Sequence, residues 1–237
     1  MKRLLSVLMI LLMIVALASC SGDKAQPDLP DNTGAALNES SEGDKDQPDL
    51  SEKAGVAPYE LSQSDKELLR AFGILNNYSQ IISFKAPEET ESVEVRVYIL
   101  REDEHWERIS GASISSGEHR SPGECKGTFT MQFKDNYAIE YVLTSCGGGF
   151  SSKIEGIDSG GRNVATTYGF LKEFKEIEID KEIPVAVMAY SFYDEGTSMR
   201  GCEPEHYFTP SVFEGVDLVR AVTLVFSDKE NPPAPAQ

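Results

Sequence analysis

Hydrophobic and polar residues alternate with a period of two along much of the chain after residue 80, which is typical of strands with one buried face. The clearest case is residues 93–100, where Val93, Val95, Val97 and Ile99 take every second position. The predicted strands are residues 80–84, 93–100, 105–109, 129–133, 137–143, 177–179, 183–193 and 216–226. The last two are long and apolar, as expected of central strands. Turns rich in Gly, Ser and Pro separate the strands, so we expect a mainly β fold, an antiparallel β-sandwich, with a β-barrel as the alternative.

The hairpin between the fourth and fifth predicted strands can be predicted in detail. A three-residue loop, 134–136, pairs Phe133 with Tyr137 and puts all the large apolar side chains of both strands on one face. A two-residue loop would put the two apolar sets on opposite faces. Asn136 at the third loop position suits the left-handed backbone that such a loop needs. We therefore expect the three-residue loop.

One short helix is expected at the start of the folded domain. Ser64 followed by Glu67 matches a capping box, in which both side chains bond the backbone of the first turn. Hydrophobic residues then recur at helical spacing, namely Leu68, Leu69, Phe72 and Leu75. We expect this apolar face to pack against the core.

The composition changes before residue 62. Residues 20–61 are rich in acidic residues, Pro, Ser and Gly, and no aromatic residue precedes Tyr59 among them. Such a segment buries too little apolar surface to offset its ordering entropy, so we expect a disordered tether. Gln-Pro-Asp-Leu occurs in it twice, which fits a duplicated spacer or a docking motif presented twice. The folded domain is expected to be residues 62–228, followed by a disordered tail, 229–237.

The N-terminus has the pattern of a signal peptide, residues 1–19. Lys2 and Arg3 precede an apolar run, 4–18, that is too short for a permanent transmembrane helix. The run ends in Leu-Ala-Ser followed by Cys20, which resembles the lipobox of bacterial lipoproteins. The resemblance implies that Cys20 becomes the mature N-terminus and carries acyl chains. These chains would hold the protein on the cell membrane or outer membrane, facing outside the cytoplasm.

The charge of the chain narrows its possible partners. The formal net charge is −17. Nucleic acids are recognised through clustered Lys and Arg, so we expect no nucleic-acid partner. Attraction to anionic lipid is likewise excluded, which leaves the acyl chains on Cys20 as the expected link to the membrane.

Three further cysteines are candidates for a disulfide, since an extracytoplasmic location permits one. They are Cys125, Cys146 and Cys202. An odd count leaves at least one thiol out, and the spacing leaves all pairings open. The same spacing does not match a metal site, and we expect no metal and no cofactor.

Catalytic motifs are absent from the sequence, and we predict no catalytic residue. His105, His119 and His206 are not spaced as helical zinc ligands, and no nucleophile elbow occurs. A Ser, a His and an acid brought together by the fold would still make a hydrolase. That alternative requires His119 or His206 to lie within hydrogen-bond reach of a Ser or Cys.

The remaining candidate for function is a surface of loops, because sandwiches often bind through loops at one end. The long loops expected are residues 111–124, 147–163 and 194–210. Four candidate ligand-binding residues lie at the last of them: Tyr193, His206, Tyr207 and Phe208. We therefore expect a non-enzymatic lipoprotein that presents a β-sandwich to a protein or glycan ligand. The alternatives are a cell-surface hydrolase and a structural or stress-related lipoprotein without a small ligand.

Overall fold

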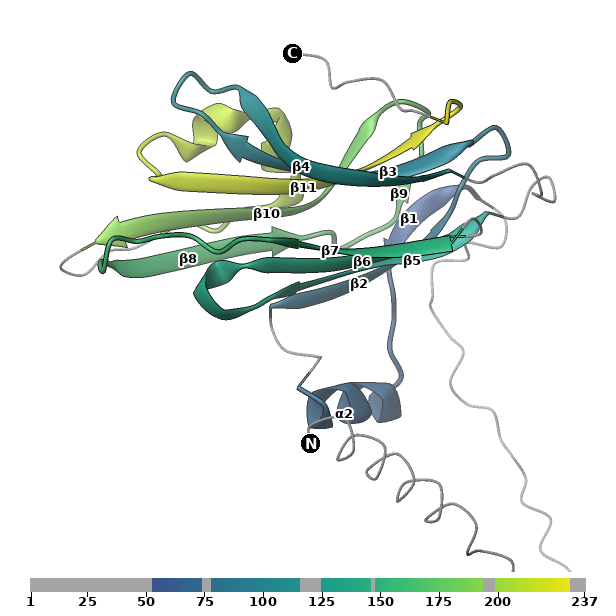
Figure 1. The fold of residues 1–237 in the computed structure, drawn as a ribbon, viewed down its shortest axis with the longest axis horizontal. Helices are drawn as coiled ribbons and strands as arrows, with labels where there is room; N and C mark the ends of the chain where they lie inside the picture. The colour runs from purple at the N-terminus through teal and green to yellow at the C-terminus, as the bar shows by residue number, and fades with distance from the viewer. Residues whose placement is uncertain (1–52, 74–77, 116–124, 146–147, 194–198, 231–237) are drawn as a thin grey trace, which may run out of the picture. The chain divides into compact units, whose positions relative to one another are not determined.

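Two antiparallel β-sheets pack face to face in the computed structural model of this chain (Figure 1). The structure describes residues 53–73, 78–115, 125–145, 148–193 and 199–230. All of these belong to one compact unit, residues 42–237. The apolar inner faces of the two sheets bury each other, which is the architecture of a sandwich. The mainly β, antiparallel sandwich predicted from the sequence is confirmed.

The first sheet has the strand order β7-β6-β5-β2-β1-β9. Its strands are β1 (Gly55–Pro58), β2 (Ser79–Lys85), β5 (Lys126–Phe133), β6 (Ile139–Ser145), β7 (Gly148–Ile154) and β9 (Lys175–Glu176). Along β2, β5 and β6 the buried residues recur at every second position. This is the burial pattern that period-two alternation predicts for a sheet with one solvated face.

The second sheet has the order β4-β3-β11-β10-β8. Its strands are β3 (Ser92–Leu100), β4 (Trp106–Ser115), β8 (Asn163–Phe170), β10 (Glu182–Tyr193) and β11 (Leu218–Ser227). The long apolar strands β10 and β11 each have a neighbour on both sides, as predicted.

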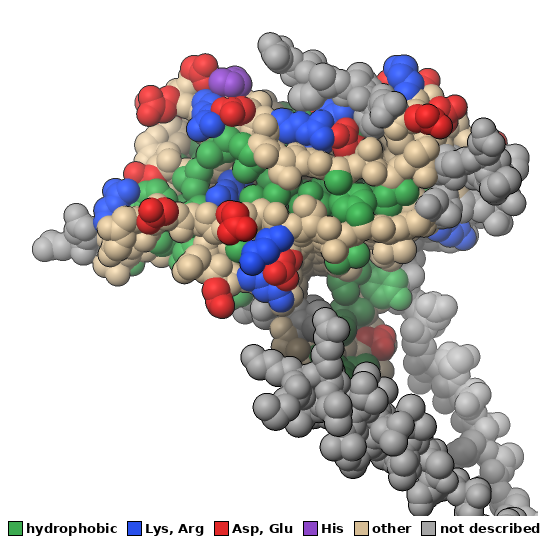
Figure 2. Space-filling view, viewed as in Figure 1, with side chains coloured by type: hydrophobic (Ala, Val, Ile, Leu, Met, Phe, Trp, Pro, Cys, Tyr) green, Lys and Arg blue, Asp and Glu red, His purple; other side chains and the backbone are tan. Residues whose placement is uncertain are grey.

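The main core lies between the sheets and is built from β-branched, leucine and aromatic side chains. Val95, Phe129 and Leu224 are among those with no solvent exposure. Each such side chain contributes about 1.5–3 kcal/mol through its removal from water. Figure 2 shows hydrophobic side chains in a band between the two layers, with charged side chains above and below it.

The second sheet is covered on its outer face as well. Two 3-10 helices, η2 (Pro204–Phe208) and η3 (Pro210–Phe213), lie in the segment that joins β10 to β11. Tyr207 and Phe213 from these helices form a second hydrophobic cluster with outward-facing residues of β10 and β11. Residues 183–190 of β10 are therefore all buried, on both faces of the strand. A Cβ at Gly169 of β8 would lie 2.2 Å from the Cys202 carbonyl oxygen, so glycine lets the covering segment lie directly on that strand.

The helix α2 (Gln63–Ala71) forms where expected but differs in its cap and its packing. Ser62, not Ser64, is the N-cap, and its hydroxyl accepts a hydrogen bond from the Asp65 backbone N–H at 3.2 Å. No residue of the helix is buried, and Phe72 is 71% exposed. The prediction that its apolar face packs against the core is wrong, because the two sheets already cover each other's inner faces.

The folded domain begins earlier than predicted. The strand β1 lies inside the segment 20–61 that was expected to be a disordered tether, and it pairs with β2 and β9. Val56 and Ala57 have no solvent exposure. The tether prediction is therefore wrong from residue 55 onward. A four-residue strand beside an acidic stretch gives too short a pattern to stand out in the sequence.

Two predicted loops are partly strands. β4 extends through residues 111–115, and β7 lies within the predicted loop 147–163. β8 was not predicted at all. Small and polar residues weaken the strand signal in both strands: Gly and Ser in β7, and Thr and Gly in β8. The strand expected over residues 177–179 is instead the short β9, which ends just before them.

The β5–β6 hairpin keeps the predicted faces but not the predicted register. Phe133 pairs with Ile139 rather than with Tyr137, so each partner is shifted by two residues. An even shift leaves the large apolar side chains on the buried face, as predicted. The connection contains the 3-10 turn η1 (Asp135–Tyr137), and Asn136 adopts the expected left-handed backbone with φ of 54°.

The predicted anchor lies outside the described residues. Cys20, the signal peptide, the tether up to residue 52 and tail residues 231–237 all belong to this undescribed part. Within the described part, no helix combines the length and the apolar composition needed to cross a bilayer.

We expect Val56→Asp to destabilise the domain by about 3–5 kcal/mol, because it buries an unpaired charge in β1. The matched control is Val142→Asp on β6, where the side chain is 42% exposed and the cost should stay below about 1 kcal/mol. Urea unfolding of both variants measures the difference. Equal losses would show that β1 is not part of the folded sheet.

Candidate functional site

A cleft of about 770 Å³ opens where the ends of β5, β8 and β10 come together. The residues that line it are Gly73, Tyr78, Gln132, Phe133, Lys134, Asp135, Tyr137, Val164, Thr166, Tyr168 and Tyr190. They come from both sheets, from the β5–β6 connection and, for Gly73 and Tyr78, from the segment between α2 and β2. A concave site in which aromatic side chains and polar groups converge is a common form of small-molecule binding site.

Aromatic rings form most of the apolar wall, in two groups. Tyr168 of β8 packs edge-on against Tyr78 at 5.3 Å and against Phe133 at 5.9 Å between ring centroids. Tyr137 packs edge-on against Tyr190 of β10 at 5.4 Å. These contacts hold the rings in fixed orientations, so the wall is preformed.

Two hydroxyl groups at the cleft have no hydrogen-bond partner in the structure. Tyr190 has no solvent exposure, and its hydroxyl oxygen is buried without a partner. The hydroxyl of Thr166 is likewise buried and unpartnered. A buried hydroxyl without a partner costs roughly 1–3 kcal/mol, so a ligand or water that bonds it gains that stabilisation.

A buried arginine bonds the backbone of one residue of this wall, Tyr137. Arg220 on β11 is 7% exposed, and its Nη1 donates to the carbonyl oxygens of Tyr137 at 3.4 Å and Glu155 at 3.2 Å. These bonds tie the second sheet to connections of the first. Burial lowers the pKa of Arg220, and a smaller electrostatic effect of Tyr190 opposes it.

The local fold explains how Tyr137 reaches the cleft. Asn136 and Tyr137 both adopt positive φ, 54° and 59°, which turns the chain sharply after β5. The Asn136 carbonyl oxygen then accepts a hydrogen bond from the Ile157 N–H at 2.9 Å. A Cβ at Gly156 would lie 2.4 Å from that oxygen, so this approach needs glycine.

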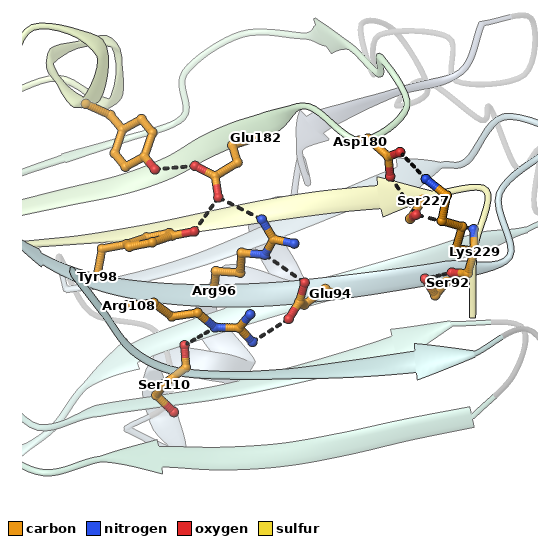
Figure 3. A network of polar contacts seen from close by, with 11 residues as sticks. Ser92, Glu94, Arg96, Tyr98, Arg108, Ser110, Asp180, Glu182, Ser227 and Lys229 are labelled. Carbon is orange, nitrogen blue, oxygen red and sulfur yellow. Dashed lines mark hydrogen bonds and ion pairs between the residues drawn. The ribbon is translucent and has the colours of Figure 1, made fainter. Parts of the chain in front are cut away.

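A separate network of charges lies on the outer face of the second sheet (Figure 3). Arg96 donates from Nε to Glu94 at 2.7 Å and from Nη1 to Glu182 at 3.1 Å. Arg108 also bonds Glu94, and the hydroxyls of Tyr98 and Tyr207 both donate to Glu182. Burial, followed by the bond to Glu182, raises the pKa of both tyrosines, so they remain donors.

This network is structural in character. Glu94 and Arg96 are almost completely buried, and each carboxylate faces at least two donors. A fully paired network holds its elements in place and leaves no group waiting for a ligand. It joins β3, β4 and β10 to the covering helix η2, which carries Tyr207.

The four predicted ligand-binding residues do not form one surface. Tyr207 is buried, stacks on Trp106 at 5.0 Å and belongs to the outer-face cluster. Phe208 beside it is 64% exposed. His206 lines a different hollow of about 690 Å³, and Tyr193 ends β10. None of the four lines the aromatic cleft.

The described histidines have local partners. The His206 ring accepts a hydrogen bond at Nδ1 from the Glu203 N–H at 3.1 Å, and His105 pairs with Asp103 at the surface. His119 lies outside the described residues. No bond from a described histidine to a Ser or Cys supports the hydrolase alternative.

The cysteines differ in state. Cys125 is disulfide-bonded, while Cys202 is free and buried, so these two are not paired. Cys146 and Cys20 lie outside the described residues. The Cys202 thiol donates to the Val187 carbonyl oxygen at 3.3 Å, and burial raises its pKa to about 11. A thiol that resists ionisation is a poor nucleophile.

The cleft was missed in the sequence, although parts of its pattern are visible there. Val164, Thr166, Tyr168 and Phe170 alternate along β8, but Thr and Gly in the strand keep this signal weak. The meeting of β8 with the β5–β6 turn depends on sheet order, which the alternation does not contain. Across the described ranges, no three His, Cys, Asp or Glu side chains are grouped as metal ligands.

We expect Glu94→Gln to cost roughly 3 kcal/mol of stability, because it removes the buried counter-charge of Arg108 and leaves Arg96 with Glu182 alone. Glu140→Gln is the control, since its pair with Lys134 at 3.5 Å is exposed and should contribute under about 1 kcal/mol. Thermal and urea unfolding would measure both. A loss no larger for Glu94→Gln than for the control would contradict a structural network.

Comparison with known proteins gave no match: no family model, no curated protein and no solved structure matches this chain. The functional argument therefore comes from the site itself. Its defining features are the aromatic wall and the unpartnered hydroxyl of Tyr190, and buried Arg220 bonds the backbone of the wall residue Tyr137.

Proposed function

We propose that this protein is a membrane-anchored, extracytoplasmic binding protein that holds a glycan in the aromatic cleft. The observation that carries the proposal is a preformed cleft walled by five aromatic rings, with a buried hydroxyl that lacks a partner. The sequence left a protein or a glycan as the expected ligand, and the aromatic cleft favours a glycan.

The chemistry of a sugar ring matches these groups. A pyranose has a flat face of C–H groups and a rim of hydroxyls, so it packs on aromatic rings and bonds polar groups at its edge. The cleft offers rings from both sheets, and Gln132 and Thr166 stand among them as polar groups. Rigid rings lose little conformational entropy when a ligand binds, which favours affinity.

The site also differs from the loop surface expected at first. Tyr193, His206, Tyr207 and Phe208 all lie outside the cleft, which brings five other aromatic residues together. The proposed ligand site is therefore the opening between the sheets.

The anchor in this proposal is Cys20. Lipidation there would give stable attachment, because two or more acyl chains bind a bilayer far more firmly than one. The acidic residues that follow would keep the domain away from an anionic membrane surface. The cleft would then face ligands outside the cytoplasm.

We expect Cys20→Ser to abolish lipidation and move the protein from the membrane fraction to the soluble fraction. Mass spectrometry of the N-terminal peptide and fractionation of cells both measure this. Ser21→Ala is the control, since it changes the neighbouring residue and leaves the thiol. Retention of Cys20→Ser in the membrane fraction would contradict an acyl anchor at this residue.

We expect Tyr78→Ala to weaken glycan binding about fivefold to tenfold, because one aromatic contact contributes roughly 1–1.5 kcal/mol. Phe208→Ala is the matched control, an exposed aromatic residue outside the cleft. A glycan array followed by calorimetry on its best ligand gives both affinities. Absence of any glycan ligand, or an equal loss in Phe208→Ala, would contradict the proposed site.

A further inference from the structure

We propose that the cleft selects acidic glycans, in which a sugar carboxylate bonds the Tyr190 hydroxyl under the positive charge of Arg220. This inference rests on the proposed glycan-binding function and adds the chemical class of the ligand. It also assigns a role to Tyr190 and Arg220, two of the buried residues that the fold leaves incompletely partnered.

Arg220 sits on the inner face of the sandwich, where its neighbours across the strands are Met188 and Ile99. Its Nη1 donates to two backbone carbonyl oxygens, while its Nε is buried without a partner. No carboxylate forms an ion pair with it among the residues that the structure describes. Backbone carbonyls supply partial charges, so the full positive charge of the guanidinium is not neutralised.

A second buried arginine, Arg96, provides a comparison. Arg96 is as deeply buried, but Glu94 and Glu182 both pair with it. Burial opposes the charge at both sites. At Arg96 the two carboxylates outweigh burial and raise the pKa, whereas at Arg220 burial prevails and the pKa is lowered. Among the described residues, Arg96 therefore pairs with two carboxylates, whereas Arg220 pairs with none.

The contacts of Arg220 place its positive charge close to the aromatic wall of the cleft. The guanidinium bonds the backbone of Tyr137, and the rings of Tyr137 and Tyr190 are both cleft walls. Burial raises the pKa of the Tyr190 hydroxyl and the charge of Arg220 acts in the opposite direction, so the two groups lie close enough to interact. A carboxylate that accepts a hydrogen bond from this hydroxyl would also feel Arg220 through a low-dielectric region, where charge attraction is strong.

The remaining charges at the cleft do not set its preference. Lys134 and Asp135 both line the mouth, so their charges oppose each other there. Lys134 also pairs with Glu140 at 3.5 Å, and both of those side chains are well exposed to solvent. Exposed charges are screened by water and salt, which leaves buried Arg220 as the dominant charge at the inner wall.

The test uses matched pairs of ligands on the full-length protein without its signal peptide. Each acidic oligosaccharide, built from uronic acids, is compared with its carboxyl-reduced neutral counterpart of the same linkage. We expect the acidic member to bind at least tenfold more tightly by calorimetry. Equal affinities would overturn the acidic preference and leave the glycan-binding function intact, whereas binding of neither class would overturn both.

Two tyrosine variants assign the preference to the cleft. Tyr190→Phe removes a hydroxyl that has no partner within the fold, so the domain should stay folded while the acidic preference falls several-fold. Tyr141→Phe is the matched control, because its hydroxyl is also buried and unpartnered but lies outside the cleft. An unchanged preference in Tyr190→Phe, or an equal fall in Tyr141→Phe, would overturn the assignment.

Arg220→Gln tests the charge itself. Glutamine keeps a donor for the backbone carbonyls and removes the positive charge. In a folded Arg220→Gln protein we expect the two ligands of a pair to bind with similar affinity. A preference that persists in that variant would overturn the role of Arg220. If the variant does not fold, the Tyr190→Phe comparison decides the inference.

Discussion

Burial of the second sheet on both faces is the constraint on which the rest of this structure depends. The first sheet covers its inner face, and the segment with η2 and η3 covers its outer face. Polar groups on the strands must then find partners inside the protein, because water is excluded from both sides. On the outer face, Arg96 finds Glu94 and Glu182. On the inner face, Arg220 bonds carbonyl oxygens in connections of the facing sheet and, among the described residues, pairs with no carboxylate.

This difference in pairing distinguishes the structural network on the outer face from the proposed ligand site between the sheets. The outer network is closed: its carboxylates, guanidinium groups and tyrosine hydroxyls bond one another and hold η2 against the sheet. The cleft between the sheets is open, with aromatic walls and the unpartnered hydroxyl of Tyr190. Stability alone would favour an apolar residue in place of a charged group at position 220. An acidic ligand in the cleft would supply the counter-charge that Arg220 lacks and so offset the cost of burying it.

Local patterns in the sequence predicted most strands and their buried faces, but they did not predict strand register or sheet order. Period-two alternation predicted most strands of the sandwich, and burial parity predicted which faces of the β5–β6 hairpin share the core. The register failed by two residues because parity cannot distinguish shifts of two. β1 was too short to detect, and the Gly-, Ser- and Thr-rich strands β7 and β8 resembled loops. The cleft joins residues far apart in the chain, so no local pattern could reveal it.

The central claim, that the open cleft is the glycan site, can be tested directly by ¹⁹F NMR of protein labelled with fluorotyrosine. Four of the nine tyrosines line the cleft, and Tyr98 and Tyr207 belong to the closed network. We predict that titration with soluble oligosaccharides of the cell envelope shifts the resonances of Tyr137, Tyr168 and Tyr190 and leaves those of Tyr98 and Tyr207 unchanged. Shifts confined to Tyr98 and Tyr207, or no shift with any oligosaccharide, would contradict the account.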